Sequence, residues 1–242
     1  MSFIISGAQD TDSLLNRPLP ADGGEIRLWR IALDRPSDEV AGFRAGLPDA
    51  DREAVDRFAR ADLRRRATVT RAALRHLLGR ACGVRPQDVP LRRSAYGKPF
   101  LAGPGRPSFS VSHAADLALV AVRARGALGV DVEREEPGRP GEAMARYFLS
   151  PVELAVYEGL APGRRRGLLT RWWTRKEAYA KAVGTGLSLA LTSVTLCGED
   201  PPISIPLPGW TMCELPVPSP YIASLAVHGP VEAVFGADWS PT

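Results

Sequence analysis

Cysteine is scarce in this chain of 242 residues, which contains three: Cys82, Cys197 and Cys213. They are odd in number, lie far apart and form no CxxC pair. The sequence therefore argues against a disulfide framework and against a cysteine-based zinc site. Such sparse use of cysteine is typical of a reducing compartment, and we expect a cytoplasmic protein.

Long hydrophobic runs are also missing. No stretch of about 18 apolar residues occurs, so the sequence predicts no membrane-spanning helix. The first ten residues, MSFIISGAQD, have neither the basic start nor the long apolar core of a secretory signal. With 45% hydrophobic and 24% charged residues, the composition is that of an ordinary globular protein that can bury a real core.

Three common signatures of nucleotide-binding or hydrolytic enzymes are absent. The chain has no Gly-x-x-x-x-Gly-Lys-Ser/Thr phosphate loop, no dinucleotide glycine fingerprint after a strand, and no Gly-x-Ser-x-Gly elbow. The commonest families that use these motifs are therefore excluded.

The chain is basic, with a formal net charge of +4 and an isoelectric point near 9.2. A basic surface favours an anionic partner, although arginines that merely keep the surface soluble explain the charge equally well. Acids such as Asp62 and Glu177 are interleaved with the arginines, and no recognition motif for nucleic acid occurs. We therefore expect no nucleic-acid partner.

Hydrophobic periodicity predicts a mixture of helices and strands. Alternating apolar and polar residues predict strands at 25–33, 108–113, 116–125, 129–133 and 221–227. Helical periodicity and capping residues predict helices at 51–58, 62–82 and 164–183, and another beginning after Ser150. Residues 1–24 are polar with two prolines, and we expect an irregular lead-in there.

The two halves of the chain show a faint repeat. Residues 114–122 and 221–227 are similar apolar strands, and each follows a long basic helix and a glycine-containing turn. The chain is long enough for two domains of about 100 to 120 residues each. We therefore expect two similar α+β halves, residues 1–124 and 125–242.

Two carboxylates stand two positions apart in the segment GVDVE. On a strand, Asp131 and Glu133 point to the same face, where their charges repel unless a cation or a proton is shared. Oxygen ligands with few protein donors suit magnesium, which takes its remaining ligands from water and phosphate. The alternative is an exposed strand edge beside a loop.

A second candidate segment is WWTRKEAYAKAVGTGL, residues 172–187. On a helix, Trp173, Glu177 and Lys181 follow one another at intervals of four and share a face. A helix-stabilising Glu–Lys pair with Trp173 in the core is a strong alternative. The neighbouring Lys176 and the Gly-x-Gly turn favour metal–phosphate chemistry, which needs a carboxylate for the cation and cationic groups for the phosphate.

Three weaker candidates carry groups that bind phosphate. Ser112 and His113 follow an apolar strand, Lys98 lies in a rigid YGKP turn, and Arg66 belongs to an arginine cluster. Each has a structural alternative: a lone structural histidine, a plain surface turn and a solvated helix end.

Taken in order, YGKPF, FSVSH, GVDVE and WWTRKEAYAKAVGTGL resemble the signature blocks of the 4′-phosphopantetheinyl transferases. The closest resemblance is to the surfactin-synthetase-activating type, a monomeric pseudo-dimer. This resemblance implies an α+β fold of two similar halves related by a pseudo-two-fold axis, with the active site between them. The first half would bind the coenzyme A nucleotide, and the second would hold magnesium and contact the carrier protein.

The resemblance also implies an activity, that of a holo-[acyl-carrier-protein] synthase. Such an enzyme transfers 4′-phosphopantetheine from coenzyme A to a serine of an apo acyl or peptidyl carrier protein, and releases adenosine 3′,5′-bisphosphate. The carrier is expected to be acidic and to belong to a polyketide or non-ribosomal peptide synthase. The alternative, an inactive coenzyme A binding protein, is disfavoured because every carboxylate of the motif and Lys181 are present.

The resemblance assigns a role to each candidate residue. Asp131, Glu133 and Glu177 would hold magnesium, or manganese in its place. Glu177 would also take the proton from the carrier serine, and Lys181 would protonate the departing nucleotide. The contacts to coenzyme A would come from Arg66, Lys98, Ser112, His113, Lys176 and Lys181.

Overall fold

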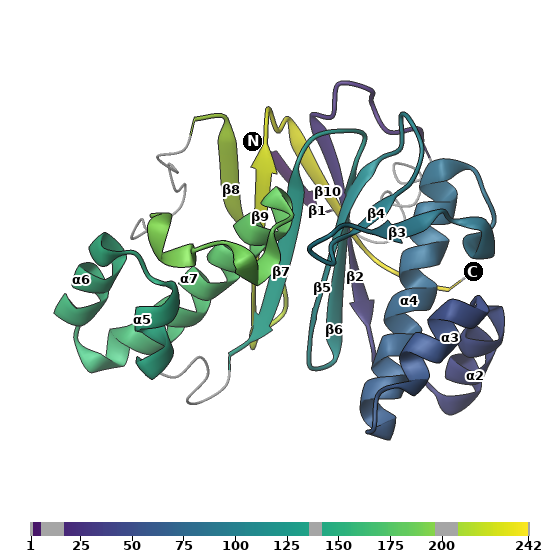
Figure 1. Ribbon diagram of the computed structural model, residues 1–242, viewed down its shortest axis with the longest axis horizontal. Helices are drawn as coiled ribbons and strands as arrows, with labels where there is room; N and C mark the ends of the chain where they lie inside the picture. The colour runs from purple at the N-terminus through teal and green to yellow at the C-terminus, as the bar shows by residue number, and fades with distance from the viewer. Residues whose placement is uncertain (1, 6–16, 136–141, 197–207, 242) are drawn as a thin grey trace.

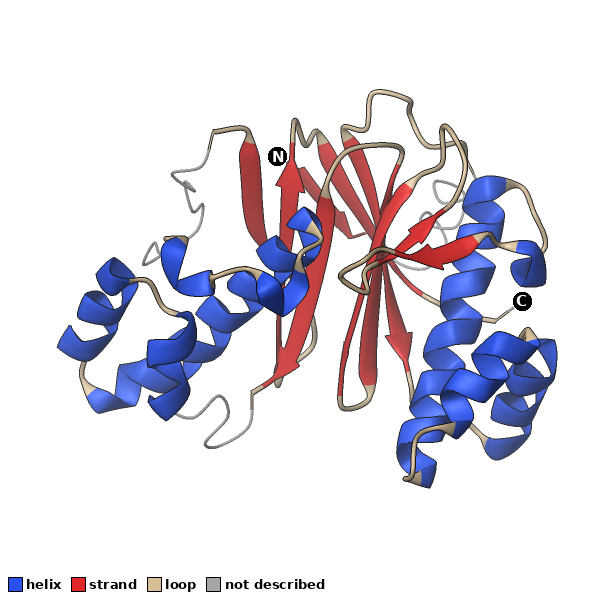
Figure 2. Ribbon diagram, in the orientation of Figure 1, coloured by secondary structure: helices blue, strands red, loops and turns tan. Residues whose placement is uncertain are grey.

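The computed structural model describes residues 2–5, 17–135, 142–196 and 208–241. Strands occupy the middle of the molecule and helices lie on its two outer sides (Figure 2). One sheet has five strands in the order β1-β10-β2-β6-β5, a second has three in the order β7-β9-β8, and β3 and β4 form a small hairpin. This mixture of helix and sheet confirms the predicted α+β class.

The two larger sheets pack against each other in the middle of the molecule (Figure 1). The five-stranded sheet contains β1 (Ser2–Ile5), β2 (Glu25–Ala32), β5 (Ser108–Ala114), β6 (Leu117–Arg123) and β10 (Ala233–Asp238). The three-stranded sheet contains β7 (Leu128–Arg134), β8 (Trp210–Leu215) and β9 (Tyr221–His228). The hairpin consists of β3 (Leu91–Arg93) and β4 (Pro99–Leu101).

The helices fall into two groups, one for each side of the molecule (Figure 1). The group beside the five-stranded sheet contains α2 (Ser37–Gly46), α3 (Asp49–Asp56), α4 (Ala61–Cys82) and the single turn η1 (Pro86–Asp88). The group beside the three-stranded sheet contains η2 (Glu142–Met144), α5 (Ala145–Phe148), α6 (Pro151–Gly159), α7 (Pro162–Val183), η3 (Gly186–Ser188) and η4 (Leu191–Ser193). No helix in these described ranges is long and apolar enough to cross a membrane.

The long helix α7 lies directly on strand β7, and a glycine makes this approach close. A Cβ atom on Gly129 would stand 1.9 Å from the carbonyl oxygen of Ala178, so no larger residue fits at that position. The helix begins with Pro162 at its first position and ends at Val183, and Gly184, which has φ +87°, caps it. This contact places the polar face of α7 beside the carboxylates of β7.

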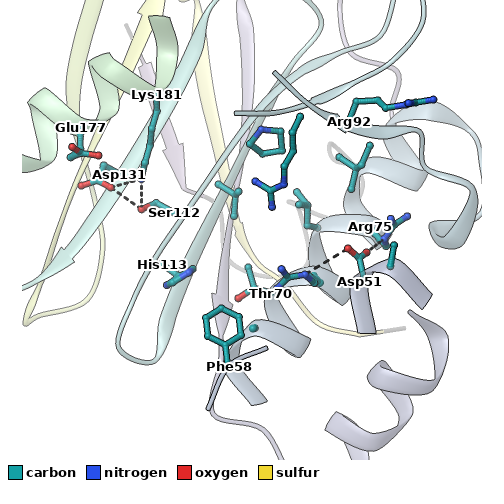
Figure 3. A pocket seen from close by; sticks show the side chains of 18 of the residues that line it. Asp51, Phe58, Thr70, Arg75, Arg92, Ser112, His113, Asp131, Glu177 and Lys181 are labelled. Atoms are coloured by element: carbon teal, nitrogen blue, oxygen red, sulfur yellow. Dashed lines mark hydrogen bonds and ion pairs between the residues drawn. The ribbon is translucent and has the colours of Figure 1, made fainter. Parts of the chain in front are cut away.

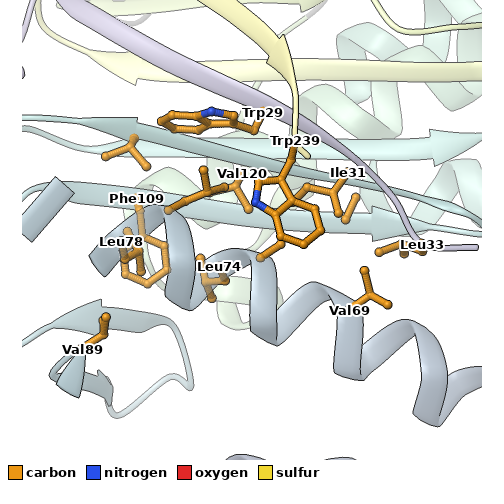
Figure 4. Close-up of a cluster of buried hydrophobic side chains, with 14 of the residues drawn as sticks. Trp29, Ile31, Leu33, Val69, Leu74, Leu78, Val89, Phe109, Val120 and Trp239 are labelled. Atoms are coloured by element: carbon orange, nitrogen blue, oxygen red, sulfur yellow. The ribbon is translucent and has the colours of Figure 1, made fainter. Parts of the chain in front are cut away.

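Of four hydrophobic clusters among the described residues, two hold the five-stranded sheet against its neighbours. In the first, Trp29, Val120 and Trp239 pack against Val69 and Leu74 of α4 (Figure 4). The second lies between the two larger sheets and joins residues of β2 and β6 to residues of β7 and β9, among them Leu28, Leu119, Val130 and Leu225. The sheets therefore share a core, which fixes β5 and β7 relative to one another.

The structure confirms most of the predicted elements, including α4, α7 and the strands β2, β5, β6, β7 and β9. Ser150 caps α6 as predicted, in a capping box with Glu153. The prediction of an irregular lead-in is wrong for residues 2–5, which form β1. That strand pairs in parallel with β10, at the far end of the chain. No local sequence pattern predicts so distant a pairing partner.

The division into halves at residue 124 stays a prediction. Helices α2 to α4 and strands β2, β5 and β6 come from the first half, and β7 to β9 with α5 to α7 come from the second. The last strand, β10, pairs in parallel with β2 and so completes the sheet of the first half.

Candidate functional site

A cavity of about 620 Å³ opens between α4, β5, β7 and α7 (Figure 3). We call it the catalytic pocket because it collects residues to which the sequence analysis assigned catalytic roles. One end holds the carboxylates of Asp131, Glu133 and Glu177, and we call this the carboxylate end. The other end, the arginine end, is lined by Arg71, Arg75, Arg92 and Arg93. The pocket therefore has an acidic and a basic end, as a ligand with both metal and phosphate contacts requires.

At the carboxylate end, Lys181 contacts residues of two strands, β5 and β7. Its Nζ atom lies 2.6 Å from Oδ1 of Asp131 and donates a 2.8 Å hydrogen bond to Oγ of Ser112. The Ser112 hydroxyl in turn donates to Oδ1 of Asp131 at 2.8 Å. Because Ser112 belongs to β5 and Asp131 to β7, this network ties the two sheets together at the site.

Glu133 and Trp173 form a second contact at this end. The indole Nε1 of Trp173 donates a 3.0 Å hydrogen bond to Oε1 of Glu133. The ring of Trp173 packs edge-on against Phe148, with 5.1 Å between the ring centroids. Trp173 thus orients one carboxylate of the site and packs beside the local core at the same time.

Two buried carboxylate oxygens at this end have no hydrogen-bond partner among the described residues: Oδ2 of Asp131 and Oε1 of Glu177. Burial raises the pKa of Asp131, and the Lys181 ammonium opposes that rise. Burial also raises the pKa of Glu177, and the charge of Asp131 raises it further. Carboxylates in this state need a cation or a proton.

These two oxygens fit a hard cation such as magnesium, which prefers carboxylate ligands. As the side chains stand, however, the described residues contain no group of three His, Cys, Asp or Glu side chains arranged to enclose a metal ion. The carboxylate oxygens therefore suit magnesium as ligands, but one oxygen of Asp131 is bound to Lys181 and one of Glu133 to Trp173.

His113 follows Ser112 on β5 and also lines the pocket. Partial burial lowers the pKa of its imidazole, and the nearby Lys181 ammonium lowers it further. A histidine of this kind is neutral near pH 7 and can still donate one hydrogen bond to a phosphate oxygen.

The arginine end was missed by sequence reasoning, which singled out the cluster around Arg66 instead. Asp51 of α3 forms ion pairs with both Arg71 and Arg75, and its Oδ1 lies 3.6 Å from Nε of Arg71. The two arginines are four positions apart on α4, so the helical period was a signal that they share a face. Arg92 and Arg93 join them from β3, and no local pattern predicts that meeting.

Three of the predicted residues do not line the catalytic pocket formed by the described residues. Arg66 forms an ion pair with Asp116, with 2.6 Å between Nη2 and Oδ1. Lys98 donates hydrogen bonds to backbone carbonyls. Lys176 is fully buried and forms an ion pair with Glu153 at 2.6 Å. Lys176 faces away from the pocket because neighbouring residues on a helix point about 100° apart.

Comparisons with known proteins match both halves of the chain. Residues 35–125 match the family model for the 4′-phosphopantetheinyl transferase N-terminal domain, and residues 127–213 match that of the 4′-phosphopantetheinyl transferase superfamily. The chain is 34% identical over 221 residues to the 4′-phosphopantetheinyl transferase HetI of Nostoc sp., which covers 90% of each protein.

Two further relatives agree with this match. A putative 4′-phosphopantetheinyl transferase of Synechocystis sp. is 32% identical and aligns over 69% of this chain and 68% of its own. The 4′-phosphopantetheinyl transferase Sfp of Bacillus subtilis is 25% identical and aligns over 76% of this chain and 82% of its own. The chain belongs to the 4′-phosphopantetheinyl transferase superfamily and is an enzyme of that family.

Proposed function

We propose that this enzyme transfers 4′-phosphopantetheine from coenzyme A to a serine hydroxyl of an apo carrier protein. The observation that carries the proposal is the catalytic pocket, in which Asp131, Glu177 and Lys181 stand opposite a cluster of arginines. The serine oxygen bonds to the β-phosphorus, and the bond from that phosphorus to the bridging oxygen breaks. The electron pair leaves with adenosine 3′,5′-bisphosphate.

The carboxylate end supplies the candidate metal ligands. Asp131 and Glu177 each have a buried oxygen without a partner, and Glu133 lies beside them in the pocket. These three would hold magnesium, or manganese in its place, and the metal would neutralise charge on the phosphates. For Asp131 to do so fully, its contact with Lys181 must loosen.

Proton transfer falls to Glu177 and Lys181. The raised pKa of Glu177 makes its carboxylate a better base, and this carboxylate lies in the pocket, where it takes the proton of the serine hydroxyl. Lys181 carries protons on Nζ at the same end of the pocket, where it steadies the pyrophosphate and protonates the leaving nucleotide. Ser112 and His113 complete the phosphate contacts from β5.

The arginine end is the proposed binding site for the phosphates of the nucleotide. Arg71 and Arg92 bring two guanidinium groups to the far end of the same cavity, and guanidinium forks suit phosphate oxygens. Arg66 remains a proposed contact that would have to exchange Asp116 for the ligand. Lys176 acts instead through the buried ion pair that holds α7 in place.

A surface on η2, α5 and α6 supports the contact with a carrier. Met144, Tyr147 and Val152 are large apolar side chains that stay exposed there, with Tyr147 at 77%. Arg146 lies between the first two in the chain. A partly apolar, acidic helix of a polyketide or non-ribosomal peptide carrier would complement this surface. We further propose that the enzyme is a monomer, since the described chain alone forms both ends of the pocket. We also propose that it acts in the cytoplasm, as its sparse use of cysteine suggested.

The test is to mix the protein with apo carrier protein, coenzyme A and magnesium and to weigh the carrier by mass spectrometry. We expect the carrier to gain the mass of phosphopantetheine, and a chelator to abolish that gain. Binding of coenzyme A without any gain in mass, over a range of carriers, would contradict the proposal and favour an inactive coenzyme A binding protein.

A further inference from the structure

Lys98 lies in the tight turn that joins β3 to β4, and the turn is held rigidly. Its backbone N–H donates to Oγ of Ser94, and its carbonyl accepts from the N–H of Ser94 at 2.9 Å. Arg93 donates a further 2.9 Å hydrogen bond to the carbonyl of Gly97, which has φ +81°. The position from which the Lys98 side chain starts is therefore fixed by the turn itself.

The side chain of Lys98 crosses from this turn to the other half of the molecule. Its stem lies against Gly184, where an added Cβ would stand 3.3 Å from Cδ of Lys98. Its Nζ donates to the carbonyl oxygens of Ala182 at 3.2 Å and of Leu128 at 3.3 Å. Among the described residues, no carboxylate forms an ion pair with it, so its hydrogen bonds go to backbone.

The two carbonyls belong to the elements that carry the catalytic groups. Ala182 follows Lys181 in the last turn of α7, and Leu128 begins β7, three positions before Asp131. Carbonyls in the last turn of a helix lack helical partners, and a cation there is also favoured by the helix dipole. Lys98 thus binds the end of α7 to the start of β7, close to the contact between Lys181 and Asp131.

Lys98 does not line the catalytic pocket itself, but open space borders it. It lines two further cavities, of about 480 Å³ and 210 Å³, and the smaller one is also lined by Lys181 and Val111 of the catalytic pocket. Burial without a compensating carboxylate lowers the pKa of its ammonium. A half-buried cation whose donors go to backbone carbonyls holds together the segments that carry those carbonyls.

We propose that Lys98 is a positioning residue, whose ammonium clamps the end of α7 to the start of β7 and so fixes the two backbone segments that carry Lys181 and Asp131. This inference rests on the proposed function, because it assigns Lys98 a part in the same reaction. It differs from the role implied by the sequence, in which Lys98 contacts the nucleotide. The two roles predict different kinetics.

The decisive variant is Lys98→Met, which keeps the length of the stem and removes the three donors. A positioning role predicts a fall in kcat of about ten- to a hundredfold, because small displacements of reacting groups cost that much. The Kd for coenzyme A and for adenosine 3′,5′-bisphosphate, measured by calorimetry, should stay within about twofold of the wild-type value. A loss of binding of tenfold or more with kcat retained would overturn the proposal, as would an unchanged kcat.

Three companion measurements separate positioning from a general loss of structure. Lys98→Arg keeps charged donors and should restore most of kcat. Lys98→Ala should regain kcat in the presence of ethylamine, because the flanking cavities admit a small ammonium; failure of both rescues would overturn the proposal. Arg106→Met, at another cation that lines the larger cavity, should leave kcat unchanged.

Failure of the proposed function would look different. In that case the wild-type protein itself would transfer nothing to any carrier, whereas failure of the Lys98 proposal leaves an active wild type and an equally active Lys98→Met. Hydrogen exchange at the last turn of α7 provides a readout that needs no turnover. We expect faster exchange there in Lys98→Met, and unchanged exchange would count against the clamp.

Discussion

The two predicted halves of the molecule, residues 1–124 and 125–242, each hold a long helix with an ion pair of similar arrangement. In the first half, Arg75 of α4 pairs with Asp51, the third residue of α3. In the second half, Lys176 of α7 pairs with Glu153, the third residue of α6. In each case the acid comes from the first turn of the preceding helix, and the cation also donates to carbonyls of the segment that follows its own helix.

The halves differ in what the helices carry next to these pairs. After Lys176, α7 continues with Glu177 and reaches Lys181, both in the catalytic pocket. At the matching positions α4 has His76 and Arg80, and neither lines the pocket formed by the described residues. One scaffold thus supports a carboxylate end in one half and an arginine end in the other, and the proposed reaction uses both.

The pairs also differ in burial. The side chains of Lys176 and Glu153 are 0% and 1% exposed, whereas those of Arg75 and Asp51 are 10% and 21% exposed. Solvent can stabilise a charge left alone in the first half but not in the second. The second-half pair should therefore matter more to the free energy of unfolding, and the first-half pair more to ligand binding.

Breaking the second-half pair should have the largest effect. Lys176→Met leaves the Glu153 carboxylate buried without its cation, and we expect a loss of about 3–5 kcal/mol in the free energy of unfolding. Urea unfolding followed by circular dichroism measures it. The double variant Lys176→Met with Glu153→Gln should recover part of the loss, because the stranded charge is removed. A loss below about 1 kcal/mol for the single variant would contradict this account.

Removing charge from the carboxylate end should nearly abolish activity. Asp131→Asn keeps the size of the side chain but removes a proposed metal ligand and the charge that holds Lys181, so we expect transfer to fall by about a thousandfold. Mass spectrometry of the carrier measures the rate. Circular dichroism should show an unchanged fold, and normal turnover at saturating magnesium would refute the metal assignment.

Breaking the first-half pair tests whether burial explains the contrast. Arg75→Met should cost about 1–3 kcal/mol of unfolding free energy, less than Lys176→Met, because Asp51 is partly exposed and keeps Arg71 as a partner. The same urea titration compares the two variants directly. Equal losses in both halves would show that the difference in burial does not decide the outcome.

The smallest change is expected from Arg71, at the arginine end. Arg71→Met removes one proposed phosphate contact, and we expect the Kd for coenzyme A to rise about tenfold, or about 1.4 kcal/mol. Calorimetry at two salt concentrations measures it, and the salt dependence should weaken with the lost charge. Arg64→Met, at an arginine of the same helix whose guanidinium donates to the backbone of Phe58 and Ala59, is the matched control. Equal binding by Arg71→Met and the wild type would contradict the assignment.

The carboxylate end could be predicted because its residues lie within two short segments of regular structure. Asp131 and Glu133 share a face by the period of a strand, and Glu177 and Lys181 by the period of a helix. Whether those two faces meet was not decided by either period. Gly129 decides it in the structure, because it lets α7 approach β7 closely enough for Lys181 to reach Asp131.

The rest of the site depended on contacts between distant segments. Arg92 reaches the pocket from a hairpin and Arg71 from a helix, so their meeting depends on how the halves pack. Lys98 also shows that a local motif does not determine which distant groups a side chain contacts. Its motif indicated a nucleotide contact, but the fold places the end of α7 within reach, and the free carbonyls there bind the ammonium.

By itself, then, the sequence determined the family, the α+β class, the long helices and the residues that carry charge at the carboxylate end. These follow from local periods and motifs, which depend on neighbours along the chain. Only the tertiary structure decided that Lys98 and Lys176 turn away from the pocket, that Arg71 and Arg92 line it, and that β1 pairs with β10. Those outcomes depend on which surfaces exclude water together, a property of the packed molecule.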